Sequence, residues 1–369
     1  MQQSQKKWTI IGGGNGGQAF AGHLGMQGID VTLYDILPSL VEAIQFQKGV
    51  KVSGELEGFG EVKATTSLAS ALEGADIIMV VTPAFAHSTI AEQAAPFLKD
   101  GQVIVLNPGS TGGVLEFKQK LSEVGCSVDV ILAETMSLLY ACRSLEPGHV
   151  EVFGIKRDLP IAALPAQKTK EVLDLLNPYL CNFVPAKNIL ETSLENLNAV
   201  VHPLPSLLNA ARIDSHASFL YYHEGISEKV GDLVEQLDRE RMSIGEALGV
   251  PLHSAKDWLN RFYGVRGNTF YEAVQQNKSY STIVGPASLK NRYFLEDIPM
   301  GLIPIAAFAD KCDVQVPIIQ SVIALASSLV PDMHSGRNLT KLGLEGMNKH
   351  EILNYVGMYN EKGLKEVQG

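Results

Sequence analysis

The sequence predicts an α/β domain at residues 1–187, followed by an all-α domain at residues 188–369. Short apolar strands alternate with helical patterns in the first half, as in a parallel sheet covered by helices. From about Asn188 onward, long helical patterns take over and no convincing strand follows. A chain of 369 residues is also long enough for two domains, each with its own core.

The first element is a strand that leads through a glycine-rich turn into a helix. Apolar residues 8–11 precede the turn, and residues 31–34 form the next strand. Glycines in a GxGxxG pattern permit a tight turn, close approach of a pyrophosphate and tight packing of the helix on the sheet. The context predicts a dinucleotide-binding Rossmann domain whose turn contributes these cofactor-binding residues: Gly12, Gly14, Asn15, Gly16 and Gly17.

Asp35 follows the second strand and indicates which dinucleotide binds. A carboxylate at this position accepts hydrogen bonds from the ribose hydroxyls of NAD and repels the 2′-phosphate of NADP. Residues 36–39 contain no Arg or Lys that could neutralise such a phosphate. We therefore expect NAD as the cofactor; a solvated turn aspartate is the alternative interpretation.

Three further apolar runs predict buried parallel strands at residues 75–83, 102–107 and 128–133. Helical patterns at 40–47, 91–98 and 114–125 lie between the strands. Ligands of such sheets bind beyond the carboxyl ends of the strands. We expect residues there to face the ligands, although each alone is equally compatible with an ordinary turn. They are Thr82, Pro83 and Asn107 for the cofactor, and Glu134 for the substrate.

Composition excludes several classes of function. The chain is 46% hydrophobic and 19% charged, with a net charge of −10, which argues against nucleic acid and anionic membranes as partners. No apolar run is long enough to span a bilayer, and the first seven residues contain no secretory signal, so we expect a cytoplasmic protein. The four cysteines are scattered without CxxC spacing, which predicts neither a disulfide framework nor a metal site.

The helical half contains a candidate acid–base residue. Asn198 and His202 are four residues apart and would share one face of a helix. Pro203 removes a backbone donor directly after His202, which weakens the helix there. The spacing alone is equally compatible with a structural histidine whose hydrogen bonds are satisfied. A later helical pattern, from Val230 to Leu248, ends at Gly249.

A second candidate segment contains Arg292, Glu296 and Asp297. Their spacing alone favours solvated surface charges. A dehydrogenase that reduces a keto-acid derivative, however, needs a guanidinium for bidentate binding of a carboxylate. It also needs a carboxylate that orients its histidine. Arg292 and Asp297 are candidates for these two roles.

The motifs together resemble the octopine and nopaline dehydrogenase family, the opine dehydrogenases, and above all its bacterial N-(1-carboxyethyl)-L-norvaline dehydrogenase branch. The resemblance runs nearly end to end and rests on these segments: Gly12 to Gly17, Asn107-Pro108-Gly109 with Thr111-Gly112-Gly113, Ala141 to Ser144, Asn198-x-x-x-His202-Pro203, and Arg292-Tyr293-x-x-Glu296-Asp297. It implies that His202 is the catalytic histidine and Asp297 its orienting carboxylate. It further implies that Arg292 binds the keto acid and that Asn198 lies beside the nicotinamide.

The reaction implied by this resemblance is the NADH-dependent condensation of an L-amino acid with an α-keto acid, with pyruvate as the expected keto acid. A dehydrogenase acting on a 2-hydroxy acid or another simple carbonyl is the alternative, since it would share the two-domain plan. A protein that only senses NAD is a third reading, which the combination of His202, Arg292 and Asp297 disfavours. The expected partners are small molecules, and a homodimer remains an open option.

Overall fold

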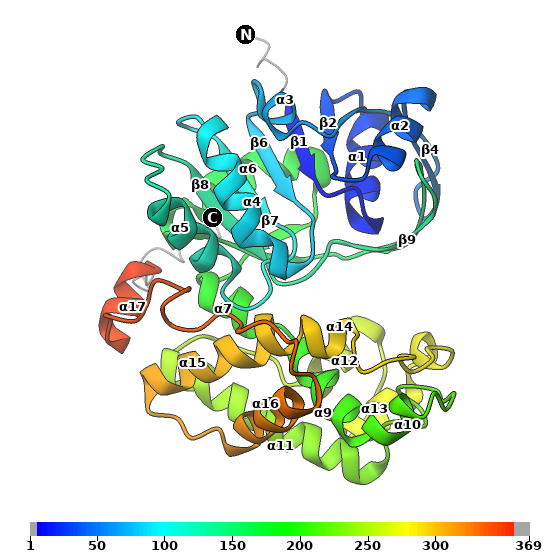
Figure 1. Ribbon diagram of the computed structural model, residues 1–369, viewed down its shortest axis with the longest axis vertical. Coiled ribbons are helices and arrows are strands. Elements are labelled where there is room, and N and C mark those ends of the chain that lie inside the picture. Colours follow the sequence, from blue (N-terminus) through cyan, green and yellow to red (C-terminus); the bar gives the residue numbers. More distant parts are fainter. Residues whose placement is uncertain (1–5, 358–369) are drawn as a thin grey trace. The chain divides into compact units, whose positions relative to one another are not determined.

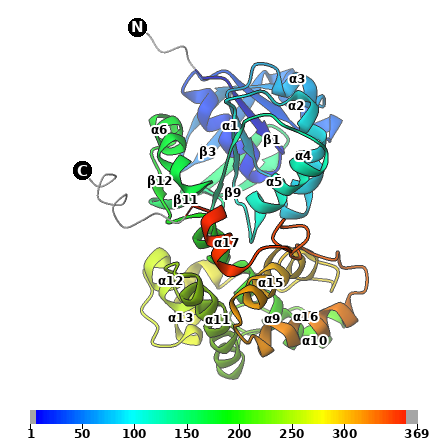
Figure 2. The same cartoon turned by 90° about the vertical axis from the view of Figure 1, so that its left-hand side faces the viewer.

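The computed structural model describes residues 6–357, which form two compact units (Figures 1 and 2). The division between the units lies after Thr192, five residues beyond the predicted boundary at 187. Residues 354–357 belong to the first unit, where the Val356 carbonyl accepts a hydrogen bond of 3.0 Å from the Ala166 N–H. Residues 1–5 and 358–369 of the predicted domains, including most of the N-terminal segment searched for a signal, lie outside the described residues.

The first unit is built on an eight-stranded sheet in the order β12-β11-β8-β7-β6-β1-β2-β5. Pairing is parallel except between β8 and β11. The four strands β1, β2, β6 and β7 are buried along their whole length, which explains their continuous apolar sequences. The strands are β1 (Trp8–Ile11), β2 (Val31–Tyr34), β5 (Lys63–Thr65), β6 (Ile77–Val80), β7 (Val103–Leu106), β8 (Ile131–Thr135), β11 (Leu159–Leu164) and β12 (Phe183–Pro185).

Helices cover both faces of this sheet. Figure 2 shows α4 and α5 on one side and α6 on the other. The strands predicted at 8–11 and 31–34 are confirmed, whereas β8 continues through Glu134, which the sequence had suggested as the residue after the strand. The helices of this unit are α1 (Asn15–Met26), α2 (Pro38–Gln47), α3 (Leu68–Leu72), α4 (His87–Ala94), α5 (Gly113–Glu123) and α6 (Thr169–Leu180). The next helix, α7 (Ile189–Leu194), contains the division after Thr192.

A second, four-stranded sheet packs on α1 and was not predicted from the sequence. Its order is β4-β3-β10-β9. Small residues on α1 permit the approach, because a Cβ on Gly22 would lie 2.5 Å from Val52 Cγ2 and one on Gly25 would lie 2.6 Å from the Glu61 carbonyl oxygen. The strands are β3 (Gly49–Gly54), β4 (Gly58–Glu61), β9 (Tyr140–Glu146) and β10 (His149–Ile155).

The second unit is helical in its described residues, apart from one isolated bridge between Leu220 and Val284. Its longest helix, α11 (Glu228–Leu248), begins at the Ser227 cap and ends at Gly249, whose φ of 66° suits glycine. Around it lie α8 (Asn198–Val201), α9 (Pro203–Leu208), α10 (Ala210–Asp214), α12 (Ala255–Tyr263), α13 (Phe270–Gln276), α14 (Arg292–Leu295), a π-helical turn (Ile298–Leu302), α15 (Ile303–Cys312) and α16 (Pro317–Leu329). The last helix, α17 (Lys349–Tyr355), crosses the division between the units.

Candidate active site

The glycine turn between β1 and α1 tolerates no side chain at two of its positions. Gly12 has a φ of +101°, and a Cβ there would lie 2.5 Å from the Val81 carbonyl oxygen. A Cβ on Gly17 would lie 1.7 Å from the carbonyl oxygen of Gly12 itself. A Cβ on Gly14, by contrast, would meet no atom of the described residues within 4 Å. The turn is therefore closed toward the protein and open on the face of Gly14.

The N-terminus of α1 has the chemistry of an anion site. Its N-cap residue, Gly14, provides no side chain that could accept from the first N–H groups, and the first turn contains no acidic residue. Free N–H groups and the helix dipole favour a phosphate at such a terminus. Gly14 and Asn15 are both exposed. The open face of Gly14 and this uncapped terminus fit the pyrophosphate of a dinucleotide.

Asp35 connects the turn to the end of β2. Its Oδ2 accepts a hydrogen bond of 2.6 Å from the Gly13 N–H, and its Oδ1 accepts one of 2.9 Å from the Leu37 N–H. A carboxylate has about four acceptor sites, so both oxygens retain capacity for ribose hydroxyls. The residues that follow are exposed and apolar, with Ile36 76% and Leu37 56% accessible. No positive charge follows Asp35 in this loop.

Two buried polar atoms near the carboxyl ends of β6 and β7 have no hydrogen-bond partner among residues 6–357. They are Thr82 Oγ1 and Asn107 Nδ2. Asn107 Oδ1, in contrast, accepts from the Leu139 N–H at 3.1 Å. Pro83 is exposed at the same edge. Buried polar groups are normally paired, so these atoms fit a site that a polar ligand completes.

Two other predicted residues have structural contacts. Asn15 Oδ1 accepts from the Ser144 N–H at 2.9 Å, which joins the start of α1 to β9. Glu134 is fully buried; its Oε2 accepts from the Val114 N–H and its Oε1 from the Thr192 hydroxyl, each at 2.9 Å. The Val114 contact holds the start of α5 and the Thr192 contact holds α7. Neither by itself supports substrate binding, which for Glu134 stays a prediction.

His202 lies at the junction of two short helices. Its own N–H donates to the Asn198 carbonyl at 3.1 Å, as in a helix, but Pro203 has no N–H with which to continue the pattern. The His202 carbonyl accepts from the Ser206 N–H at 3.1 Å and also from the Tyr221 hydroxyl at 2.7 Å. Asn198 is exposed at the start of α8, one helical turn before His202. The predicted helix break at Pro203 is confirmed.

The His202 side chain is hydrogen-bonded at both ring nitrogens. Its Nδ1 lies 2.7 Å from Asp297 Oδ2, and its Nε2 lies 3.0 Å from the Tyr222 hydroxyl. A carboxylate accepts, so Nδ1 carries the proton and Nε2 of the neutral ring accepts from the phenol. His202 is 8% and Asp297 4% exposed. The fixed tautomer directs the lone pair of Nε2 at the Tyr222 hydroxyl.

Arg292 differs from its neighbours in being exposed. Its side chain is 63% accessible, and its Nη2 lies 3.3 Å from Oε2 of Glu296, whose side chain is only 12% accessible. Asn291 caps the short helix, since its Oδ1 accepts from the Tyr293 N–H at 2.8 Å. The ring of Tyr293 stacks on His202 with a centroid distance of 4.1 Å. Arg292 is thus one residue from the ring that contacts the histidine, with its guanidinium accessible to a carboxylate.

Sequence reasoning missed the tyrosines. Tyr222 lies 20 positions from His202, and no local spacing connects the two. Tyr293 is part of the Arg-Tyr element of the family resemblance, which is the only signal that pointed to it. Burial raises the pKa of Tyr222 well above its ordinary value, as neighbouring Tyr293 and Tyr221 also do.

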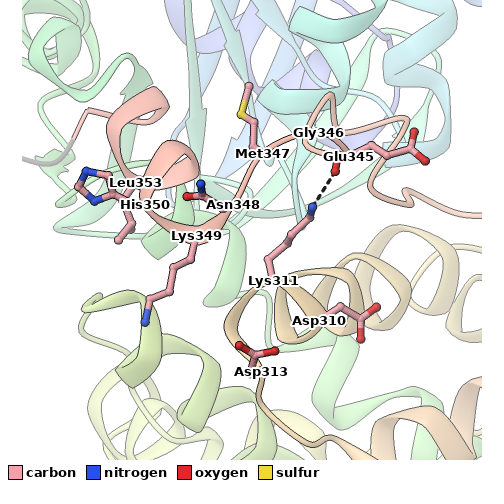
Figure 3. A pocket seen from close by; sticks show the side chains of 10 residues that line it. All are labelled: Asp310, Lys311, Asp313, Glu345, Gly346, Met347, Asn348, Lys349, His350 and Leu353. Atoms are coloured by element: carbon pink, nitrogen blue, oxygen red, sulfur yellow. Dashed lines mark hydrogen bonds between the residues drawn. The ribbon is translucent and has the colours of Figure 1, made fainter.

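A surface hollow elsewhere on the helical unit contains none of the predicted site residues (Figure 3). It has a volume of about 680 Å³, and Lys311 Nζ donates to the Glu345 carbonyl at 2.7 Å beside it. Its lining carries both signs of charge, including Asp310, Asp313 and Lys349. Within residues 6–357 we find neither a cluster of three potential metal ligands nor a helix long and apolar enough to cross a membrane.

Comparisons with known proteins agree with this arrangement. Residues 185–330 match the family model for the NAD/NADP octopine/nopaline dehydrogenase alpha-helical domain, and residues 7–124 match that for the NAD-dependent glycerol-3-phosphate dehydrogenase N-terminus. An opine dehydrogenase of Arthrobacter sp. is 42% identical, over 95% of this chain and 99% of its own. Octopine dehydrogenase of Mizuhopecten yessoensis is 27% identical, over 88% and 90%. A structure of octopine dehydrogenase with NADH and agmatine has a TM-score of 0.81 at 24% identity, covering 96% and 99%.

A dinucleotide-binding unit and a helical unit with a histidine–carboxylate pair define a nicotinamide-dependent oxidoreductase. Within that class, the chain belongs to the octopine/nopaline dehydrogenase family, the opine dehydrogenases. The expected Rossmann domain and α-helical domain are confirmed.

Proposed function

We propose that this enzyme condenses an L-amino acid with an α-keto acid, reduces the product with NADH, and catalyses the reverse oxidation. The contact between His202 Nδ1 and Asp297 carries the proposal, with Arg292 exposed five residues before Asp297. The 42% identical relative is an opine dehydrogenase, and octopine dehydrogenase has been solved with NADH and pyruvate. Pyruvate is therefore the keto acid we propose.

Each side chain of the candidate site has a different role in this reaction. Arg292 binds the carboxylate of the keto acid through two parallel hydrogen bonds, which orients the carbonyl for attack by the amine. His202 exchanges a proton at Nε2 as the carbonyl oxygen leaves as water. Asp297 accepts from Nδ1, which fixes the tautomer and stabilises the imidazolium. The bound dinucleotide supplies the hydride that reduces the resulting C=N bond.

The dinucleotide is held mainly by the backbone of the first unit in this proposal. The N–H groups at the start of α1 bind the pyrophosphate over the face of Gly14, and Asp35 accepts from the adenosine ribose. Thr82, Pro83 and Asn107 line the cofactor at the strand ends, while Asn198 lies beside the nicotinamide. Glu134 contributes to the amino-acid site through the segment that it anchors.

The test follows NADH oxidation with pyruvate against a panel of L-amino acids. The proposal expects oxidation only when an amino acid is present, with a secondary amine dicarboxylate as the product in mass spectrometry. A dehydrogenase of 2-hydroxy acids would oxidise NADH with pyruvate alone and form lactate. Equal rates with and without an amine would therefore overturn the proposal.

Two further predictions concern the cellular location and the oligomeric state of the enzyme. We propose that it acts in the cytoplasm and forms a homodimer. Cell fractionation checks the first of these, and light scattering of the purified chain at several concentrations checks the second. A constant mass of 39.9 kDa would contradict the dimer.

A further inference from the structure

The histidine assigned to proton transfer has no ring nitrogen directly available to a substrate. Asp297 occupies Nδ1 and the Tyr222 hydroxyl occupies Nε2. The ring of Tyr293 covers one face of the imidazole, with an angle of 21° between the planes. A proton that leaves or reaches His202 in this arrangement passes through Tyr222, unless Tyr222 first moves away.

Aromatic packing opposes such a movement. The ring of Tyr222 stacks on Tyr280 with a centroid distance of 4.0 Å and an angle of 15°. It also meets Tyr221 edge-on, at 4.9 Å and 87°. Tyr222 is only 5% exposed. Stacked and edge-on aromatic pairs are stabilising beyond the area they bury, so turning the Tyr222 ring out would lose two such contacts.

The backbone beside Tyr222 is held as well. The Tyr221 N–H donates to the Ile283 carbonyl at 2.8 Å, and Leu220 forms a bridge with Val284. The Tyr221 hydroxyl also contacts the Ser206 hydroxyl at 2.9 Å, in addition to its bond to the His202 carbonyl. These contacts hold the segment that contains Tyr222 in place and connect it, through Tyr221, to the backbone of His202.

We propose that Tyr222 is a catalytic residue, whose hydroxyl carries the proton between His202 Nε2 and the reacting oxygen or nitrogen of the substrate. This inference rests on the proposed condensation and adds a residue to it. The phenol is suited to the task because it donates one hydrogen bond and can accept another at the same oxygen.

The proton balance is simple in both directions. When the substrate amine gives up a proton, the Tyr222 oxygen takes it while the phenolic proton moves to His202 Nε2. When the carbinol oxygen leaves as water, the imidazolium returns its proton to the Tyr222 oxygen, and the phenolic proton moves to the leaving oxygen. Tyr222 ends each step as a neutral phenol. Between the two steps the positive charge resides on His202, next to Asp297, and after the second step it resides on the protonated C=N product.

The surroundings of Tyr222 support concerted transfer. Burial, together with the neighbouring Tyr293 and Tyr221, raises the pKa of the phenol well above its ordinary value. This shift disfavours a free phenolate, and the phenol already lies 3.0 Å from His202 Nε2, so we expect the two protons to move in one step.

The test compares Tyr222→Phe with the matched variant Tyr280→Phe. The first change removes the hydroxyl bonded to His202 and keeps a ring that can stack. The second removes a hydroxyl from the stacking partner of Tyr222 and leaves the His202 contacts intact. We expect Tyr222→Phe to lower kcat by on the order of 100-fold with NADH affinity and Tm unchanged, since general acid–base groups typically contribute this much. Tyr280→Phe should retain kcat within about threefold.

A proton inventory in H2O/D2O mixtures provides the second readout. Transfer through Tyr222 moves two protons in one step, so kcat should vary with the deuterium fraction along a curve in the wild type. A linear dependence, or a Tyr222→Phe variant with wild-type or higher kcat, would overturn the relay and show that Tyr222 merely covers the histidine. If the wild type lacked amine-dependent activity, the proposed function itself would fail, which separates the two results.

Discussion

The two units build their candidate binding residues in different ways. In the first unit most of the proposed dinucleotide-binding residues lie in one stretch from Gly12 to Asp35, whose candidate contacts are backbone N–H groups and positions without a side chain. In the helical unit the site consists of side chains from distant segments; His202 and Asp297 are 95 positions apart. The fold of the glycine turn should therefore be sensitive to a Cβ at its closed positions, whereas the helical unit's candidate site should be sensitive to the loss of single polar groups.

The largest effect is expected where the backbone site is closed. Gly17→Ala would place a Cβ 1.7 Å from the Gly12 carbonyl oxygen, so the turn must open or α1 must shift. We expect a loss of about 4 kcal/mol or more in the free energy of unfolding, together with loss of NADH binding. Denaturant titration and fluorescence titration with NADH measure the two quantities.

Gly14→Ala is the matched control for this comparison. Its Cβ would meet no described atom within 4 Å, so stability should stay within about 1 kcal/mol of the wild type. NADH affinity should still fall, because the added methyl group lies where the pyrophosphate approaches. If both alanines destabilised the protein equally, the distinction between a closed and an open face would be wrong.

The side-chain site is tested most strongly at His202. His202→Ala should lower kcat by on the order of 100-fold or more and leave NADH binding nearly intact. Asp297→Asn preserves the shape of the partner but removes the charge, and should also impair turnover while the protein stays folded. Steady-state kinetics and NADH titration of each variant measure these effects. Near-normal kcat in His202→Ala would assign the acid–base role to another group.

The difference between the units also explains what could be predicted from sequence. The strand, glycine turn, helix, strand and acid of residues 8–35 are a local pattern, so β1, α1, β2 and Asp35 were recognised with nearly correct bounds. His202, Arg292 and Asp297 were selected because a known chemistry requires such groups, and the structure brings His202 and Asp297 into contact. Their roles remain predictions.

The same reasoning could not predict contacts between segments that lie far apart in the sequence. The second sheet joins β3 and β4 to β9 and β10, which lie about a hundred residues later and show no pattern linking them. Tyr222 reaches His202 only through the packing of its loop against the segment at Ile283 and Val284. The return of residues 354–357 to the first unit depends on backbone hydrogen bonds, for which apolar periodicity contains no signal.

Lys156 is a buried lysine of the first unit whose charge we expect to lower the free energy of unfolding. Burial lowers its pKa to about 8, and its Nζ donates to the Ser137 hydroxyl at 2.7 Å; no carboxylate of residues 6–357 forms an ion pair with it. The unfolded chain binds more protons between pH 8 and about 10.5, so stability should rise with pH across this window. Lys156→Met should remove that rise and stabilise the protein at pH 7 by up to about 3 kcal/mol.

Denaturant titrations of the wild type and Lys156→Met from pH 7 to 10.5 provide the measurement. Other groups titrate in this range, but they are common to both proteins, so the difference between the curves isolates Lys156. A constant difference across the window would show that the lysine is solvated in the folded protein.

Arg292→Lys tests the geometry of carboxylate binding, because lysine keeps the positive charge. Lysine cannot reproduce the two parallel hydrogen bonds that a guanidinium makes to a carboxylate. Arg292→Lys should therefore raise KM for pyruvate and cost roughly 2 kcal/mol in kcat/KM, with much less effect on KM for NADH. A surface arginine paired only with Glu296 would leave pyruvate kinetics unchanged. Rates at varied pyruvate, with NADH and amino acid saturating, distinguish these outcomes.

The smallest expected effect concerns Asp35, the one charged side chain in the proposed backbone site. Its carboxylate stays beside the turn through the Gly13 and Leu37 N–H groups, and no cation follows it. A 2′-phosphate would meet this negative charge, so kcat/KM for NADH should exceed that for NADPH by at least about tenfold, or about 1.4 kcal/mol.

Asp35→Asn sharpens this test, because an amide oxygen can still accept from one of the two N–H groups while the charge is removed. The preference for NADH should shrink in the variant mainly through improved use of NADPH. If the wild type used both cofactors equally, Asp35 would only support the turn. If the variant lost activity with both cofactors in parallel, its carboxylate would matter for the shape of the turn and not for discrimination, and the first unit would then recognise its cofactor through the backbone alone.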